Sequence, residues 1–212
     1  MDYYNPKTVF SSIDHHGRYA FGNQPSIAQW NLARLADAIL PLLHEDENKA
    51  IEVGEEIIHS FKEKYEIKFH KMMKRKLGLI TDENDDVILI QELLDTMEKN
   101  NLDYTNTFRD FMNGKSINDN LKKIHDKWKI RIDKQNRSHE EILSIMKNAN
   151  PVVIPRNHKV EESLKEAHKG NLVSLNNLLN ALKDPYKERS DLKLYQQPAH
   201  ETDKKYKTFC GT

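Results

Sequence analysis

The sequence has little of what a disulfide framework, a membrane span or a secreted protein needs. Its 212 residues include a single cysteine, Cys210, which has no internal partner for a disulfide. No apolar run approaches the ~18 residues that a membrane span requires. The first residues, Met-Asp-Tyr-Tyr-Asn-Pro, also lack the basic and then apolar pattern of a signal peptide. We therefore expect a cytoplasmic protein that has no membrane partner.

An excess of charge of one sign is missing as well. Lysine and arginine total 33, and aspartate and glutamate also total 33. Because the chain carries no net positive charge, it has no general attraction for polyanions. Nucleic acid is therefore not an expected partner.

Motifs that would assign an enzyme class directly are absent. The sequence contains no Gly-x-Gly-x-x-Gly or Gly-Lys-Ser/Thr phosphate loop, no His-Glu-x-x-His zinc motif and no Gly-x-Ser-x-Gly elbow. Residues 82–86 begin like a calcium loop, but Val87 stands where glycine is required and Leu93 where glutamate is required. The pair His15-His16 lacks a third ligand at a usual spacing. We expect no metal in this chain.

The sequence predicts an all-α fold, a helical bundle with an irregular N-terminal loop and an irregular C-terminal tail. Glycine and proline are scarce between residues 26 and 149, apolar residues recur there at helical spacing, and strands do not alternate with helices. Pro41 is expected to kink or end the first helix. From Pro185 the pattern stops, which predicts a tail that wraps on the body or stays mobile. Helices are expected over residues 26–40, 46–77, 87–97, 105–112, 117–132, 140–146, 160–168 and 172–182.

The opening segment is the most unusual part of the sequence. Residues 11–25 are polar, aromatic and punctuated by glycine, and they follow neither a helical nor a strand period. A loop of this length is usually functional or disordered, and Tyr19 and Phe21 favour burial over disorder. We expect hydrogen bonds made by Asp14 and Arg18 to hold the loop against the helices.

Titratable residues on the expected helices are interpreted as surface groups. The run Lys-Met-Met-Lys-Arg-Lys at 71–76 ends a long helix, where cations favour the helix dipole, so a solvated helix end is expected. Cys210 lies two residues from the end of the sequence and is expected to be an exposed, reactive thiol. Four histidines among charged neighbours are also expected at the surface: His59, His70, His125 and His139.

Several blocks, spread from one end of the sequence to the other, carry a resemblance to a known family. The most specific is Ser12-Ile13-Asp14-His15-His16-Gly17-Arg18-Tyr19-Ala20-Phe21-Gly22-Asn23-Gln24-Pro25, preceded by Tyr4-Asn5-Pro6 and followed by Trp30-Asn31-Leu32-Ala33-Arg34-Leu35. The others are Asp103-Tyr104-Thr105-x-Thr107-Phe108-Arg109, Asn150-Pro151 with Ile154-Pro155-Arg156-Asn157-His158, Leu178-Leu179 with Leu182-x-x-Pro185-Tyr186, and Tyr206-x-Thr208-Phe209-Cys210-Gly211-Thr212. In this order the blocks resemble the carboxy-terminal part of the selenoprotein O family.

The resemblance implies both a fold and an activity. Members of the family are protein adenylyltransferases with a pseudokinase fold, which bind ATP and magnesium between two lobes and transfer AMP to Ser, Thr or Tyr hydroxyls of protein substrates. Their nucleotide- and metal-binding residues precede the region that this chain resembles. The resemblance therefore implies no catalytic residue and no cofactor in this chain. It implies an activation-segment-like loop at 1–25, a helical C-lobe domain at 26–184 and an irregular tail at 185–212.

Particular residues acquire expected roles from the same resemblance. Trp30, Asn31 and Arg156 are expected structural anchors. Cys210 matches a cysteine or selenocysteine of the family. Phe10 stands where some members have the cysteine that pairs with it, so an intramolecular disulfide is excluded. Glutathionylation and an intermolecular disulfide of Cys210 remain open. The residues expected to organise the activation-segment-like loop are Asp14, Gly17, Arg18, Tyr19, Gln24 and Pro25.

These observations leave three functional hypotheses open. The first is the C-lobe part of a protein adenylyltransferase, as an engineered truncation or a split-gene product, inactive until the missing N-terminal lobe is supplied. The second is a stand-alone helical module that binds a protein partner and has no catalytic activity. The third is a bundle enzyme that uses buried histidines. Both of the first two predict a sizeable apolar patch near residues 1–21 and the first helix.

Overall fold

The protein is described from a computed structural model, which covers residues 1–114 and 118–199. The described residues are all-helical, with 68% of them in helices, which confirms the predicted all-α class, while the correspondence to a kinase-like C-lobe stays a prediction. Over the described residues, pairing of the strand type is limited to an isolated bridge between Tyr3 and Asp103. No helix of this part of the protein has both the length and the apolar character needed to cross a membrane.

The described residues form two compact units. The core unit comprises residues 1–4 and the residues from Met72 onward, and the hairpin unit comprises Asn5–Lys71. Helix α2 (Glu47–Lys76) contributes residues to both units. The predicted functional boundaries at residues 25 and 184 stay predictions.

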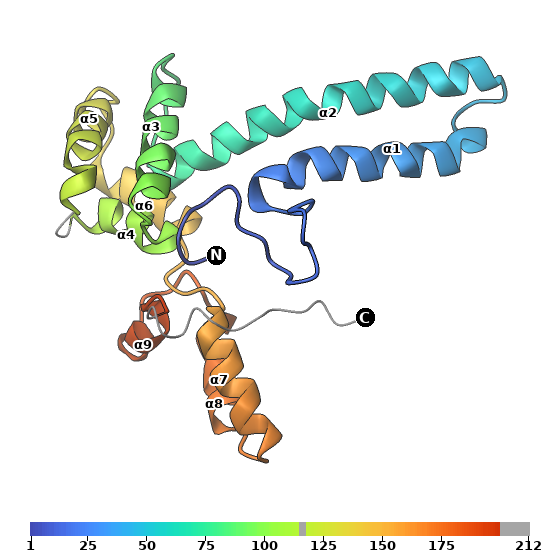
Figure 1. Cartoon of the computed structure of the whole chain (residues 1–212). Coiled ribbons are helices and arrows are strands. Elements are labelled where there is room, and N and C mark those ends of the chain that lie inside the picture. The colour runs from blue at the N-terminus through green and yellow to red at the C-terminus, as the bar shows by residue number, and fades with distance from the viewer. Residues whose placement is uncertain (115–117, 200–212) are drawn as a thin grey trace. The chain divides into compact units, whose positions relative to one another are not determined.

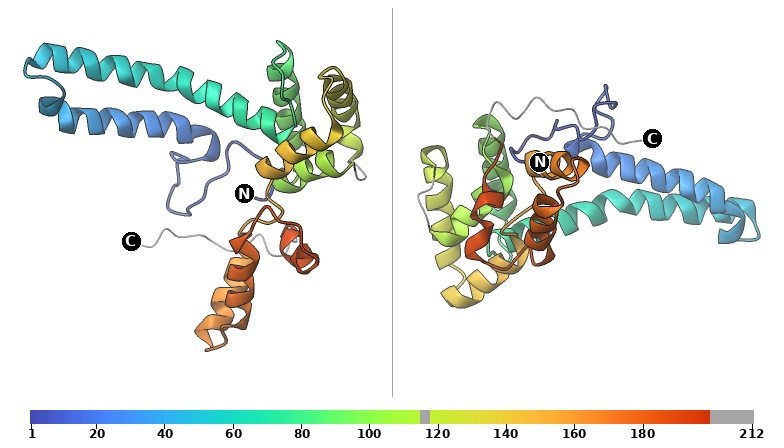
Figure 2. Two further views of the ribbon diagram at one scale, coloured as in Figure 1. Left: turned by 180° about the vertical axis from the view of Figure 1, so that it is seen from behind. Right: turned by 90° about the horizontal axis from the view of Figure 1, so that it is seen from below.

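The hairpin unit consists of the opening loop and two long helices. After a short 3-10 helix, η1 (Phe21–Asn23), helix α1 (Gln24–Leu43) runs antiparallel to α2, and the two lie side by side in every view (Figures 1 and 2). The Gln29 side-chain amide donates to the carbonyl oxygen of Ile58 across the pair at 2.9 Å. At the start of α2 the Asp46 carboxylate accepts from the backbone of Lys49 at 3.2 Å, as a helix cap does.

The core unit contains the remaining helices (Figure 1). They pack in a bundle in which α3 contacts α5, α4 contacts α6, and α7 pairs with α8. The bounds are α3 Asp86–Lys99, α4 Tyr104–Asn113, η2 Asp119–Leu121, α5 Lys122–Asp133, α6 His139–Ala149, α7 Asn157–His168, α8 Val173–Lys183, η3 Ser190–Leu192 and α9 Lys193–Gln196.

The interior of the core unit is closely packed. The Trp128 indole donates to the carbonyl oxygen of Leu77 at 2.8 Å, which joins α5 to the end of α2. Gly78, at φ +69°, ends α2, and a Cβ there would lie 2.7 Å from Ile142, so this turn requires glycine. Side chains with no exposed surface come from several helices: Met73, Leu77, Leu93, Met97, Phe108, Met146 and Leu192.

Several expectations about the elements need correction. Pro41 lies inside α1, which continues to Leu43, because a proline so near the helix end disturbs few hydrogen bonds. The helix expected from 117 begins as η2 at Asp119 and becomes α-helical at Lys122. The stretch after Pro185 was expected either to wrap on the body or to stay mobile, and Leu192 agrees with the first alternative, since it is fully buried against Val152, Val153 and Ala181.

Candidate functional site

The opening loop, for which an activation-segment-like role stays a prediction, is held by the carboxylate of Asp14. Its two oxygens accept hydrogen bonds from the backbone N–H groups of Arg18 and Tyr19, both at 2.8 Å. Gly17, directly before Arg18, has φ +64°, in the left-handed region that glycine adopts without strain. Its carbonyl oxygen accepts from the side chain of Asn23 at 2.8 Å. The loop therefore has a defined backbone conformation.

The two ends of the loop are also joined to each other. The backbone of Phe21 donates to the carbonyl oxygen of Thr8 at 2.9 Å, and that of Gly22 donates to Pro6 at 2.8 Å. A Cβ at Gly22 would lie 3.1 Å from the Pro6 carbonyl oxygen, so a larger residue would disturb this approach. Residues 6–22 therefore form a closed loop that leads directly into α1.

The loop contacts α1 through stacked cations and rings. The guanidinium carbon of Arg18 lies 4.7 Å from the centre of the Trp30 ring and 5.8 Å from that of Tyr19. Arg34 lies 5.7 Å from the same Trp30 ring and pairs with Asp37 at 3.0 Å. Trp30 is 49% exposed, so its contact with the loop is a cation–π interaction at the surface of the unit.

The structure brings most of the predicted loop residues together. Asp14, Gly17, Arg18 and Tyr19 form one turn, and Trp30 lies against it. Gln24 and Pro25 are the first two residues of α1, and Asn31 is exposed on that helix. Tyr19 is 52% exposed, so the expectation that this ring is buried was wrong. Cys210 lies outside the described residues.

Arg156 belongs to the core unit and is almost completely buried there. Its guanidinium pairs with Asp103 at 2.7 Å and with Asp2 at 2.9 Å, and it donates to the carbonyl oxygen of Gln196 at 2.8 Å. Burial by itself lowers the pKa of Arg156, but the two carboxylates outweigh it and raise that pKa. Arg156 thereby joins three stretches of chain that are distant in sequence.

A second buried ion pair, which the sequence did not reveal, involves Asp86. Its carboxylate accepts from Arg131 at 2.7 and 3.1 Å and lies 3.1 Å from the Lys74 amine. Burial raises the pKa of Asp86, but the hydrogen bonds from Arg131 and Lys74 outweigh it and lower that pKa. Lys74 also pairs with Asp82, so the acidic stretch 82–86 serves to fasten α2 to α3 and α5.

Two titratable residues that were expected at the surface are buried. The amine of Lys76 lies over the rings of Phe108 and Tyr104, at 4.9 and 5.4 Å, and donates to Asn150 at 3.2 Å. Burial lowers the pKa of Lys76 to about 8. His125 packs against the Phe111 ring of α4 and the Trp128 ring of its own helix α5, and burial lowers its pKa. Charge periodicity alone did not distinguish these positions, because tertiary packing covers them.

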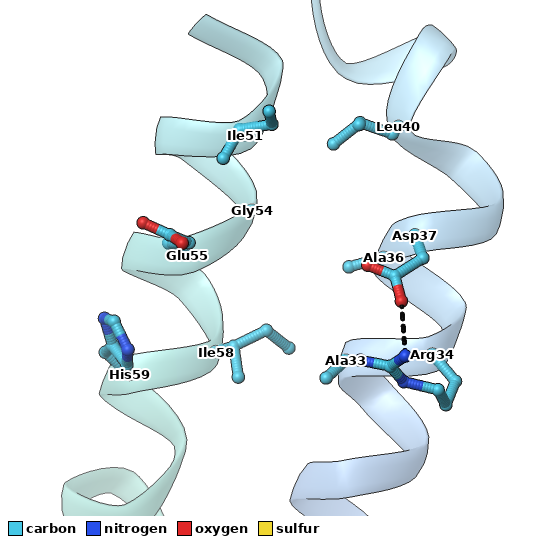
Figure 3. A pocket seen from close by; sticks show the side chains of 10 residues that line it. All are labelled: Ala33, Arg34, Ala36, Asp37, Leu40, Ile51, Gly54, Glu55, Ile58 and His59. Atoms are coloured by element: carbon cyan, nitrogen blue, oxygen red, sulfur yellow. Dashed lines mark ion pairs between the residues drawn. The ribbon is translucent and has the colours of Figure 1, made fainter. Parts of the chain in front are cut away.

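A groove with a mixed lining, apolar in its larger part and charged along its edges, lies between α1 and α2 (Figure 3). Its volume is about 240 Å³. The charged side chains of Arg34, Asp37 and Glu55 lie along it, and Figure 3 shows the ion pair between Arg34 and Asp37 on its α1 side. His59 on α2 completes the polar lining. The groove offers hydrogen-bonding groups but no set of converging catalytic side chains.

Comparison with known proteins identifies the family. A family model described as protein adenylyltransferase SelO matches residues 1–183. The chain belongs to the SelO family. Relatives named protein nucleotidyltransferase YdiU are similar along the whole chain: 45% identity over 218 residues for Clostridium perfringens strain SM101, and 45% over 219 residues for Bacillus cereus strain AH187.

The chain spans less than half the length of these relatives. The aligned region covers 100% of this chain but 44% of the Clostridium perfringens relative and 45% of the Bacillus cereus relative. More than half of each SelO-family relative therefore lies outside the region that this chain matches.

Of ATP and magnesium, which the resemblance implies for the SelO family, the metal ion has no fitting site among the described residues. In residues 1–114 and 118–199, no three His, Cys, Asp or Glu side chains are grouped so that they could hold a metal ion. The enclosed acids Asp86 and Asp103 are paired with Arg131 and Arg156. We therefore assign no nucleotide-binding step to these residues.

Proposed function

We propose that this chain forms the C-lobe-like part of a protein adenylyltransferase with a pseudokinase fold. In this proposal it scaffolds the activation-segment-like loop and the side of the enzyme that receives the protein acceptor. Membership of the SelO family carries the proposal, together with the similarity to nucleotidyltransferases along the full chain. The complementary portion of such an enzyme binds ATP and magnesium, and this chain is inactive without that portion.

The geometry of the loop supports a role in presenting an acceptor. Its backbone is fixed by Asp14 and by the closure between Thr8 and Phe21. Its side chains Phe10, Ile13 and Tyr19 nevertheless remain exposed. A rigid backbone with exposed apolar and aromatic groups favours contact with a polypeptide, because little ordering entropy is lost when it binds.

Transfer of AMP depends mainly on how the protein positions the acceptor hydroxyl and the phosphates, and little on covalent bonds to the protein. The hydroxyl of a Ser, Thr or Tyr gives its proton to a base of the complementary portion as its oxygen attacks the α-phosphorus of ATP, the bond from that phosphorus to the bridging oxygen breaks, and pyrophosphate leaves. Phosphate binding falls to the complementary portion. In this chain the Asp14 turn and the Arg18–Trp30 stack hold the surface against which the acceptor lies.

A complementation experiment tests the proposal. The chain is mixed with the portion of the Clostridium perfringens relative outside the matched region, with magnesium and with ATP labelled at the α-phosphate. We expect labelled AMP on protein only when both are present. Asp14→Ala should lower the transfer about tenfold or more by releasing the loop, whereas Asp133→Ala, at an exposed position on α5, should leave it unchanged. Transfer by the chain alone would overturn the proposal.

A second candidate function is a helical interaction module without catalytic activity. The exposed apolar side chains of α1, among them Leu32, Leu35 and Leu42, favour it. It predicts that the same mixture transfers no AMP.

A further inference from the structure

The α1–α2 pair has a second groove, which differs in chemistry from the one in Figure 3. Only Ser60 and Lys64 contribute polar side chains to its lining, and its volume is about 260 Å³. We call it the apolar groove. Its apolar lining includes Leu32, Leu35 and Leu43 on α1 and Gly54, Ile57 and Phe61 on α2.

The lining residues follow a helical stripe on both walls. On α1 they recur from Leu32 to Leu43 at intervals of three and four residues, and on α2 the same spacing runs from Gly54 to Phe61. Two parallel stripes with a groove between them form the surface on which a third amphipathic helix packs its own stripe.

Nothing in the hairpin unit covers these stripes. Helix α1 contains no buried residue, and on the groove walls Leu35 is 54% exposed and Ile57 is 57% exposed. Fully burying a large apolar side chain stabilises a protein by about 1.5–3 kcal/mol. The exposed side chains of these stripes do not contribute that free energy in the isolated chain. An exposed apolar stripe of this kind marks a surface that is covered when the protein is assembled.

The length of the relatives bears on what covers this stripe in an assembled enzyme. More than half of each nucleotidyltransferase relative lies outside the region that matches this chain. In those relatives both portions belong to one polypeptide, so their local concentration relative to each other is high and a single apolar groove is enough to dock them. The positive charge of Lys64 beside the groove favours a helix that carries an acidic residue at that position.

We propose that the apolar groove docks a helix of the complementary portion of the adenylyltransferase. This inference rests on the proposed function, in which that portion supplies ATP binding. The helix presents apolar residues to Leu35 and Ile57 and an acidic residue to Lys64. Its docking holds the hairpin unit, and thus the loop that precedes α1, against the nucleotide-binding half.

The test co-expresses this chain with the portion of the Clostridium perfringens relative that lies outside the matched region, and measures the complex by affinity capture and titration. Leu35→Glu and Ile57→Glu should each weaken the complex about tenfold or more, because each places a charge in the groove. Two matched controls should bind as the unaltered chain does. Leu164→Glu on α7 starts from 51% exposure and Ile130→Glu on α5 from 61%, and neither lines the groove.

The outcomes separate the inference from the proposed function. A complex that the groove variants weaken, but that transfers no AMP, supports the inference and overturns the proposed function. AMP transfer that Leu35→Glu and Ile57→Glu leave intact overturns the inference alone. The inference also fails if no complex forms with the unaltered chain, or if sedimentation shows that the groove variants only dissociate a dimer of this chain. Circular dichroism of each variant checks that its helices are retained.

Discussion

The core unit and the hairpin unit bury their side chains very differently. Large side chains such as Phe108 and Met73 have no exposed surface in the core unit, whereas the buried hydrophobic residues of Asn5–Lys71 are Ala20 and Ala50. Two helices side by side shield only one face of each other, while a bundle encloses its helices on several sides. The core unit therefore supplies most of its own stability, and the hairpin unit leaves apolar surface for another chain segment to cover.

The two units also differ in whether their ion pairs are buried. In the core unit Arg156 and Asp86 are enclosed and satisfied by partners from distant segments. In the hairpin unit the ion pair between Arg34 and Asp37 is local and exposed to solvent. Exposed pairs contribute at most about 1 kcal/mol, but removing one partner of a buried pair costs about 3–5 kcal/mol. Substitutions should therefore act strongly in one unit and weakly in the other.

The largest contrast is expected from truncating one apolar side chain in each unit. Phe108→Ala removes a ring with no exposed surface and should lower the free energy of unfolding by about 3–5 kcal/mol. Leu35→Ala, at a half-exposed position on α1, should change it by no more than about 0.5 kcal/mol. Urea unfolding followed by circular dichroism measures both. Equal effects would mean that the hairpin unit buries this face in the isolated chain.

A smaller effect, which depends on pH, is expected from Lys76. Burial lowers its pKa to about 8 in the folded chain, from 10.5 in the unfolded chain. The folded state therefore favours the neutral amine. Above pH 10.5 the amine is neutral in both states, and its burial then carries no penalty. As the pH falls from 10.5 to 8, the unfolded chain takes up the proton first, and the free energy of unfolding decreases by about 3 kcal/mol.

Lys76→Met removes this titration while keeping a long apolar stem between the rings of Phe108 and Tyr104. Relative to the variant, the unaltered chain should gain stability as the pH rises from 8 to 10.5. Chemical denaturation across that range measures the difference. Lys71→Met, at an exposed position on the same helix, is the control and should keep the normal pH profile. A difference that stays constant with pH would contradict the lowered pKa.

The smallest effect is expected from the loop of the hairpin unit. Asp14→Ala removes the acceptor for the Arg18 and Tyr19 backbone N–H groups. It should lower the free energy of opening this loop by about 1 kcal/mol. Amide hydrogen exchange should speed up at these two positions and remain unchanged in α5. Asp37→Ala, which removes only an exposed ion pair, should leave the exchange at Arg18 as it was.

Much of the fold was predictable because local rules govern it. The start of α2 after Asp46 follows from a capping carboxylate, and its end at Gly78 follows from a residue that adopts positive φ without strain. Asp14 and Gly17 likewise form a turn from groups a few residues apart. Family resemblance pointed to the same loop, since its motif lies within one continuous stretch.

Properties that depend on distant segments were not predictable from the sequence. The basic run at 71–76 reads as a solvated helix end, yet Lys76 is enclosed by rings from α4. His125 was expected at the surface and packs against Phe111 instead. Neither position carries a local signal, because whether a polar residue is covered depends on which helices pack over it.

The sequence by itself determined that the chain is helical, where caps and glycine mark helix ends such as those of α2, how the opening loop turns, and to which family the chain belongs, because those features depend on neighbouring residues and on motifs within single stretches. Tertiary structure alone decided that Asp86 meets Arg131, that Arg156 meets Asp2, and that the apolar stripe of α1 stays uncovered in the hairpin unit. The physical reason is that apolar periodicity states which face of a helix avoids water, but not which segment arrives to cover it.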